Sequence, residues 1–355
     1  TATEAHESIQ LNNAQLMTDD TVLCPAEEVS IERKIEFSLG MERDLVAKPK
    51  VKNVPYNSVQ DITGQRHIFS SAGLNARSKS RMCVAYAYAL IEDGDKNAME
   101  GAGQANRLFA DLNVNDLVAR AYSNTIDILE GSPVESGHYE VIFDEEMQAS
   151  LFGVFSLMFS GKSAKDGVNP MREKLGHTIA DTRLNIIDQP LNSQGFGYSL
   201  FDAEGIATAA TPLITDGVLN TLIHNSATAS FFDVATTGHA SRSPKSTMGV
   251  GLHQVEIAAG EATSTDLFAG KYLLLTDLTG LHSGANAISG NFSFGASGYL
   301  CQDGERIQPV RGITVAGNFY EMLGKISLIG KDQYWNWEKS ARMPHVRFAD
   351  IAISG

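Results

Sequence analysis

Apolar residues recur at helical spacing in two segments of the first third of the chain. Between residues 28 and 46 they return every three or four positions, which predicts an amphipathic helix that ends before Pro49. Residues 113–129 repeat this spacing more clearly, and Asn113 or Asn115 is placed to cap the helix with its side-chain oxygen. Both segments therefore predict a helix with one apolar face.

The strand-like segments are short, and many are separated by glycine. Residues 84–91 alternate β-forming and small side chains before the turn sequence 93–95, and residues 139–143 form a second short run. Residues 145–159 are apolar nearly all round and predict a buried helix. Beyond Gly161 further β-rich pieces follow, at residues 185–187, 271–275, 291–294, 298–300 and 312–315.

These later pieces predict a mainly antiparallel sheet. The pair Asp303-Gly304 lies between two β-rich runs and is a hairpin signal, and residues 321–326 predict a short helix. We therefore expect an α+β fold with two domains, which a chain of 355 residues is long enough to form. The N-terminal α/β portion covers residues 1–135, and a mainly antiparallel, open barrel-like domain covers residues 136–355.

Charge and cysteine content narrow the function classes. The formal net charge is −14, from 42 acidic and 28 basic residues, and the densest basic run, residues 77–81, is more typical of a solvated loop or strand edge. Direct nucleic-acid binding is disfavoured because it depends on Lys and Arg neutralising phosphate. Cys24, Cys83 and Cys301 form no CxxC pair, which argues against a disulfide framework and against a structural zinc site.

The apolar runs are also too short for a membrane protein. None approaches the roughly 20 apolar residues that a spanning helix needs. The chain starts without Met and without a basic stretch followed by an apolar one, so we expect no signal peptide. With its unpaired cysteines, the sequence predicts a cytoplasmic protein that does not associate with a membrane.

Three motifs approach known catalytic or nucleotide-binding signatures, and each departs from its pattern. Residues 101–106 have Asn106 where a dinucleotide fingerprint has its third glycine. Residues 160–163 resemble the end of a phosphate-binding loop, but Ser156 stands where that loop begins with glycine, so a loop after a buried helix is expected. Residues 280–284 place a serine near a histidine without forming G-x-S-x-G.

Two catalytic hypotheses remain for the polar residues of the second half. His224, His239 and His282 lie in segments rich in glycine and threonine, and would form a metal site if the fold gathers them. Asp202 and Glu204 would share one face of an extended strand, where they could share a proton for acid–base chemistry. We prefer a structural role for this pair, in which the carboxylates accept hydrogen bonds from the glycine-rich backbone.

Many runs, in a fixed order, resemble the signature of one family. The densest run is Phe201-Asp-Ala-Glu-Gly205, continued by residues 213–214 and 217–219. The others are Ser136–Ile142, Lys174–Ala180, Thr237–Arg242, Gly280–Gly284, Ile288–Ser293, Gly298, Asp303–Glu305, Pro309-Val310 and Ile313–Asn318. From about Asn57 to Gly355 the chain is thus similar to the TldD/PmbA peptidase family, once called modulator of DNA gyrase. Residues 1 to about 55 do not align with the family's N-terminal region, which predicts that this region is shortened, divergent or incompletely present.

The resemblance also separates two branches of the family. TldD-like chains hold a metal with an H-E-x-x-x-H helix and a late cysteine, whereas PmbA chains, also called TldE, lack these residues and pair with a TldD chain. The corresponding helix here, residues 145–152, has no histidine. The segment 332–338 has Trp335 and Trp337 but no cysteine. The chain therefore resembles the PmbA/TldE branch, and we assign it no catalytic and no metal-binding residue.

The resemblance implies a role in a cytoplasmic peptidase complex that matures peptides and degrades unfolded ones. Zinc is then expected in a TldD-like partner subunit and not in this chain, and a homodimer is the common default for a chain of this kind. Peptide binding by strand addition would suit the glycine-rich half. The candidate residues for lining a peptide groove are Asp202, Glu204, Gly205, His224, His239, Arg242, His282, Asn291 and Phe292.

Two other functions stay open at this point. The chain could be a stand-alone hydrolase with a different site, built from the three histidines and the two carboxylates named above. It could also be a non-catalytic regulator of DNA gyrase that binds gyrase itself. The charge balance argues only against direct contact with DNA.

Overall fold

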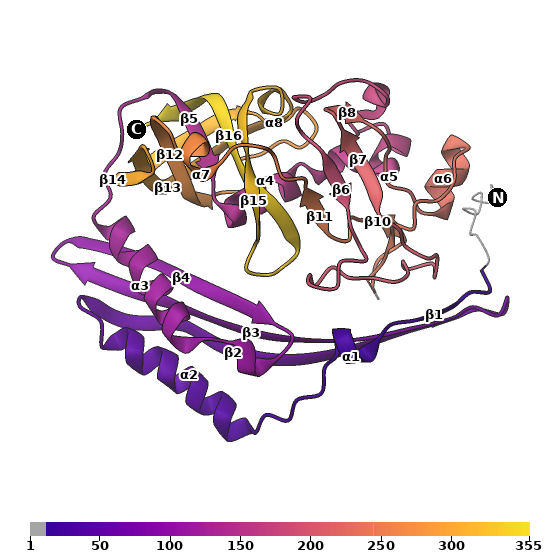
Figure 1. Cartoon of the computed structure of the whole chain (residues 1–355), viewed down its shortest axis with the longest axis horizontal. Coiled ribbons are helices and arrows are strands. Elements are labelled where there is room, and N and C mark those ends of the chain that lie inside the picture. The colour runs from indigo at the N-terminus through magenta and orange to yellow at the C-terminus, as the bar shows by residue number, and fades with distance from the viewer. Residues whose placement is uncertain (1–11, 244) are drawn as a thin grey trace, which may run out of the picture.

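The computed structural model describes residues 12–243 and 245–355. Its N-terminal part is a sheet with two helices on one face (Figure 1). The sheet consists of β2 (Val51–Phe69), β3 (Asn75–Asp93) and β4 (Lys96–Asn106), all antiparallel, and the short β1 (Gln15–Met17), parallel to β3. The helices are α2 (Ile31–Val46) and α3 (Val114–Leu129), and α1 (Asp20–Leu23) precedes them.

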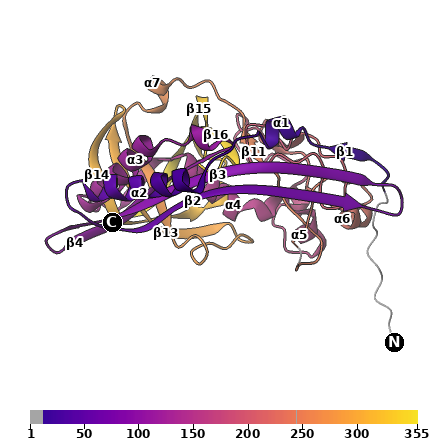
Figure 2. The ribbon, with the colours of Figure 1, turned by 90° about the horizontal axis from the view of Figure 1, so that it is seen from below.

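Side-chain size along β3 explains how the helices lie on this sheet. Cys83, Ala85, Ala87 and Ala89 alternate along the strand and are fully buried in one cluster with residues of α2 and α3. Because successive side chains of a strand point to opposite faces, the residues between them face the C-terminal part. The β2–β3 hairpin extends along that part toward α6 (Figures 1 and 2), which follows from the unusual length of its two strands.

A second, ten-stranded sheet forms the C-terminal part. Its strands are β5 (Gly137–Phe143), β6 (Ile186–Asp188), β7 (Thr211–Thr215), β8 (Val218–Leu219), β11 (Val255–Ile257), β12 (Lys271–Thr279), β13 (Asn291–Gln302), β14 (Glu305–Asn318), β15 (Ile326–Trp335) and β16 (Ala341–Ser354). The helices of this part are α4 (Glu145–Val154), α5 (Gly161–Lys165), α6 (Ser226–Phe232), α7 (Ser264–Leu267) and α8 (Phe319–Met322), and β9 (Ala240–Ser241) pairs with β10 (Gly249–Val250).

This sheet curls back on itself. β14 pairs with β13 along most of its length, and its residues 314–316 also pair with residues 352–354 of β16. The apolar core lies inside the curl, where Phe155 stacks on Phe319 with ring centroids 4.5 Å apart. The predicted fold class is confirmed, because the structure is α+β with mainly antiparallel sheets and without full closure into a barrel.

The structure confirms most predicted elements and corrects others. The two N-terminal helices form at residues 31–46 and 114–129, and Asn113 caps the second by accepting the N–H of Asp116 at 3.1 Å. The hairpin at Asp303-Gly304 is also confirmed, with φ angles of 52° and 86°. The helix expected over residues 145–159 ends at Val154, and a 3-10 turn, residues 156–159, completes it.

Other corrections concern boundaries and the motifs that departed from their patterns. Residues 291–294 and 298–300 belong to one strand, β13, and the helix expected at 321–326 is the single turn α8. The run at 101–106 lies in the antiparallel strand β4, and Ser160 begins helix α5 instead of a loop, because its side chain caps that helix. None of the helices in the described residues is both long and apolar enough to cross a membrane.

A buried group of charges joins α2 to the sheet. Both carboxylate oxygens of Asp61 accept hydrogen bonds from Arg81, each at 2.9 Å, and Lys34 of α2 lies 2.7 Å from one of them. The Arg81 side chain is only 5% exposed. Hydrogen bonds from Arg81, more than any other contact, lower the pKa of Asp61 to about 2. Arg81 is thus a structural residue, not part of a solvated basic patch.

We expect Asp61→Asn to lower the free energy of unfolding by about 2 kcal/mol, because the buried Arg81 guanidinium loses the carboxylate that accepts two of its hydrogen bonds and keeps Glu27, 3.2 Å away, as an ion-pair partner. Urea denaturation measures this loss. Asp44→Asn is the matched control, since Asp44 pairs with a well-exposed Arg43, and it should cost less than about 0.5 kcal/mol. Equal effects of the two substitutions would show that the Arg81 contact is not structural.

Candidate functional site

Six polar residues come together at the end of β6 and in the loops between β6 and β11, and we call them the loop cluster. They are Asp188, Asp202, Glu204, His224, His239 and His253. Asp188 ends β6 and has no solvent exposure. Its carboxylate accepts His239 Nε2 at 2.8 Å and the backbone N–H groups of His253 and Gln254 at 3.0 and 2.7 Å. Asp188 therefore fixes the positions of two loops that lie 51 and 65 residues further along the chain.

Asp202 organises a turn in the same region. One of its oxygens accepts the N–H groups of Glu204 and Ile206, and the other accepts the N–H of Ala240 at 3.0 Å. Residues 202–205 thus form a turn and not the extended strand that the sequence suggested, because the Asp202 carboxylate draws the backbone around itself. The Glu204 carboxylate instead accepts the N–H and the hydroxyl of Ser226, at 2.9 and 2.6 Å.

The backbone at Gly205 packs against the tip region of the β2–β3 hairpin. Its φ angle is +77°, and a Cβ placed there would lie 2.3 Å from Cδ2 of Leu74. Its carbonyl oxygen accepts the side-chain amide of Asn12 at 2.8 Å. Arg66 of β2 donates to the carbonyl oxygens of Phe201 and Asp202, at 2.6 and 2.8 Å, so this glycine turn is one of the places where the N-terminal sheet joins the C-terminal part.

The remaining candidates do not all reach this cluster. His224 is buried and its Nδ1 lies 3.1 Å from the Thr228 hydroxyl, whereas Arg242 is exposed after β9. His282 is exposed between β12 and β13, and Asn291 and Phe292 begin β13. The nine predicted groove residues therefore fall into two places, the loops between β6 and β11 and the start of β13.

The predicted metal site of His224, His239 and His282 is wrong, because the fold does not bring these three histidines together. Within residues 12–243 and 245–355, the group whose ligand atoms all lie within 4.8 Å of one another is Asp188, His239 and His253, and His224 and His282 are not part of it. Each of the three is already held by protein partners: His253 Nε2 lies 2.9 Å from the Gly238 carbonyl, and His239 Nδ1 lies 2.8 Å from that of Thr237. Nothing in the local sequence of Asp188 or His253 indicated their place, because it depends on loops meeting across the fold.

Helix α4 contacts the chain end through three side chains on its first turns. Gln148 is fully buried and makes two hydrogen bonds to the backbone of β16. It donates to the Pro344 carbonyl at 2.8 Å and accepts a hydrogen bond from the Val346 N–H at 3.1 Å. The Glu146 carboxylate accepts the backbone N–H of Trp337, and burial raises its pKa to about 7. Glu145 lies 3.3 Å from His345 Nε2.

The segment between β15 and β16 in turn contacts the N-terminal sheet. A Cβ at Gly103 would lie 2.8 Å from the Trp337 ring, so the indole packs directly on the β4 backbone. Lys339 donates to the side-chain oxygen of Asn106, also on β4, at 2.6 Å. Trp337 thus sits between α4 and β4, at a contact of both parts of the chain.

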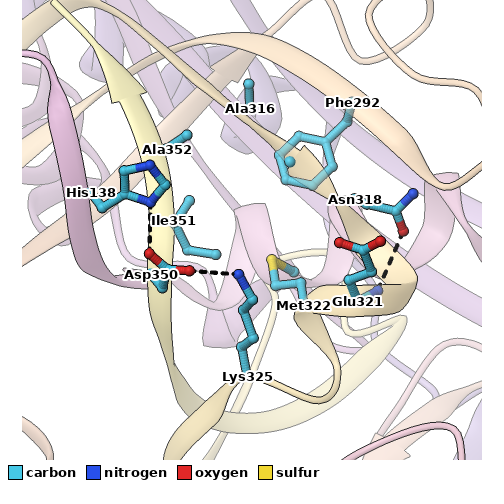
Figure 3. Close-up of a pocket in the computed structure, with 11 residues that line it drawn as sticks. His138, Phe292, Ala316, Asn318, Glu321, Met322, Lys325, Asp350, Ile351 and Ala352 are labelled. Atoms are coloured by element: carbon cyan, nitrogen blue, oxygen red, sulfur yellow. Dashed lines mark hydrogen bonds and ion pairs between the residues drawn. The ribbon is translucent and has the colours of Figure 1, made fainter.

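Phe292 belongs to a different feature, a hollow of about 140 Å³ on the C-terminal sheet (Figure 3). Asn291 adjoins it, because its side-chain oxygen accepts the amide of Asn318 at 2.9 Å, and Asn318 lines the hollow. Strands β5, β13, β14 and β16 and the turn of α8 surround it. The sequence signal at Asn291 and Phe292 thus leads to an open hollow, whereas the loop cluster is largely buried.

Family models match almost the whole described chain. Residues 136–355 match the PmbA/TldA metallopeptidase C-terminal domain, and residues 24–129 match the PmbA/TldA metallopeptidase central domain. The match begins at residue 24, nearer the N-terminus than the motif runs suggested. Metalloprotease PmbA of Escherichia coli O157:H7 is 29% identical over 86% of this chain and 66% of its own length. A metalloprotease of Methanothermobacter thermautotrophicus is 29% identical over 62% of this chain, which spans only 48% of that relative's length.

Solved structures share the fold. A Thermotoga maritima protein described as a modulator of a DNA gyrase has 26% identity and a TM-score of 0.83, over 92% of this chain and 75% of its own. TldE from Thermococcus kodakarensis has 22% identity and a TM-score of 0.83, over 100% of this chain and 80% of its own, and this likeness shows the fold alone.

We expect Gly205→Ala to lower the free energy of unfolding by about 2–4 kcal/mol, because the new Cβ meets both an unfavourable φ angle and the Leu74 side chain. Gly94→Ala is the matched control, since Gly94 also has a positive φ, +61°, but nothing within 4 Å of the new Cβ, and it should cost about 1 kcal/mol. Thermal or urea unfolding of both variants tests the joint between the sheets. Equal losses would count against it.

Buried His224 makes stability depend on pH. Burial, and then the neighbouring His239, lowers the pKa of His224 from 6.5 to about 4, so the folded protein favours the neutral ring. This contribution is complete above pH 6.5 and is lost as the pH falls toward 4, by at most about 1.4 kcal/mol per pH unit. Urea unfolding of His224→Gln between pH 7 and pH 4 should show a shallower slope than wild type. His67→Gln, at an exposed histidine, should leave the slope unchanged.

Proposed function

Because the chain belongs to the PmbA/TldD metallopeptidase family, we propose that it is a PmbA/TldE-like subunit of a two-chain peptidase and lacks a metal site of its own. A TldD-like subunit would be its partner and would hold the zinc. The complex would act in the cytoplasm on unfolded peptides, in their maturation and degradation. This chain spans 66% of the length of its Escherichia coli relative. The activity of the complex is therefore part of the proposal.

The observation that carries the proposal is the contact between α4 and the segment before β16. The family resemblance assigns the metal ligands to these two segments, and here neither contains a histidine or a cysteine. The Glu146 carboxylate instead accepts the backbone N–H of Trp337, and the indole ring of Trp337 packs against Gly103. A hydrogen-bonded carboxylate and an indole supply no thiolate or imidazole ligands for zinc, so water activation would have to come from the partner.

The same contact supports a structural role in the complex. Trp337 joins α4 to β4, so it holds the N-terminal sheet against the C-terminal part of the chain. We take the break near residue 135 as the domain boundary, between the two family matches that end at 129 and begin at 136. The nine candidate groove residues remain proposals, with the loop cluster and the start of β13 as separate peptide contacts.

The alternatives have weaker support. A stand-alone hydrolase built from the three histidines and two carboxylates is disfavoured, because His282 lies outside the loop cluster and the two carboxylates accept different N–H groups. Regulation of gyrase rests on what a related structure is called, and the net charge of −14 argues against direct DNA contact.

The test is to purify the chain alone and together with an H-E-x-x-x-H partner from the same genome. Metal analysis should find no stoichiometric zinc in the chain alone, and an unfolded peptide should stay intact. The complex should cleave that peptide, and a chelator should abolish the cleavage. A complex in which the partner's first motif histidine is replaced by alanine is the control. Stoichiometric zinc with chelator-sensitive cleavage by this chain alone would refute the proposal.

A further inference from the structure

The hollow beside Phe292 exists because small residues meet on adjacent strands. Ala316 of β14 pairs directly with Ala352 of β16, and Ala352 pairs on its other side with His138 of β5. Gly317 pairs with Phe292 of β13, so no side chain at Gly317 covers the ring. Cross-strand neighbours of this size leave space above the sheet that larger side chains would fill.

The floor of the hollow is apolar, and its rim is charged. Buried Phe292, Met322 and Ile351 form much of the floor. On the rim, the two oxygens of Asp350 are shared between two partners, with His138 Nδ1 2.7 Å from one and Lys325 Nζ 2.7 Å from the other (Figure 3). Asp350 thus already neutralises the groups that would attract an anion.

Glu321 is the rim group that is left over. Its backbone N–H donates to Asn318, but within residues 12–243 and 245–355 no ion pair or hydrogen bond reaches its carboxylate. Glu321 is exposed, and it lines the hollow together with Phe292 and Met322 (Figure 3). With two carboxylates and one permanent cation, the rim favours a positively charged ligand.

We propose that this hollow binds a primary ammonium group carried on a short aliphatic chain. Glu321 would accept hydrogen bonds from the ammonium, and the aliphatic chain would pack on Phe292, Met322 and Ile351. A lysine side chain and the amino terminus of a peptide both offer this chemistry. No residue of α4 lines the hollow, so the site stands or falls independently of the peptidase proposal.

The experiment is a titration of the full chain with n-pentylammonium. Binding is measured by isothermal titration calorimetry and by NMR chemical shifts of methyl groups in the floor of the hollow. Saturable binding is expected, and pentan-1-ol, which has the same shape without the charge, should bind at least about tenfold more weakly. Glu321→Gln should weaken pentylammonium binding by about tenfold or more and leave pentan-1-ol binding unchanged. Glu305→Gln, an exposed change at the far end of β14, is the control and should alter neither.

A second variant tests the cavity itself. Ala352→Leu should fill the hollow and abolish binding of both compounds, with an unchanged melting temperature to show that the fold is intact. Nα-acetyl-lysine amide and leucine amide then distinguish a lysine side chain from an amino terminus. The proposal is overturned if pentylammonium does not bind, if it binds no better than the alcohol, or if Glu321→Gln leaves its affinity unchanged.

Discussion

A carboxylate without solvent exposure must find its hydrogen-bond donors inside the protein, and Asp188 finds them in His239, His253 and Gln254. These donors lie between 51 and 66 residues further along the chain. Because an unsatisfied buried charge is so costly, the loops have one favourable arrangement around it. The buried Asp202 carboxylate accepts backbone N–H groups in the same way at a second position. Irregular, glycine-rich backbone thus keeps a defined conformation without regular secondary structure.

That shape in turn helps to determine where the N-terminal sheet meets the rest of the chain. The turn at Gly205 contacts the β2–β3 hairpin through Arg66 and Leu74, and Trp337 packs on Gly103 at another contact. At both contacts a glycine lets a side chain or a turn approach the opposite backbone closely. The region around α4, where the family resemblance places metal ligands in its catalytic branch, is thereby built from the same contacts that hold the molecule together. The side chains of this region are thus accounted for by contacts within the chain.

The two polar regions of the C-terminal half differ in what they offer a ligand. In the loop cluster every carboxylate accepts protein N–H or O–H groups, so these charges are used to hold the fold. At the hollow beside Phe292 the small residues on β14 and β16 leave an open space, and the Glu321 carboxylate lines it unpaired within the described residues. Ligand binding therefore has more physical support at the hollow than at the cluster that the densest sequence motif indicated.

Features that depend on neighbouring residues could be predicted from the sequence. Helical periodicity and the Asn113 cap located α3, the Asp303-Gly304 pair located the β13–β14 hairpin, and the ordered motif runs indicated the family. The three-dimensional fold produced the features that depend on contacts between distant residues. It turned residues 202–205 into a bend through the N–H groups of Ile206 and Ala240, and it brought Asp188 to His239 and Trp337 to α4. No local pattern encodes these contacts, because buried polar groups choose partners by proximity in the fold and not by spacing along the chain.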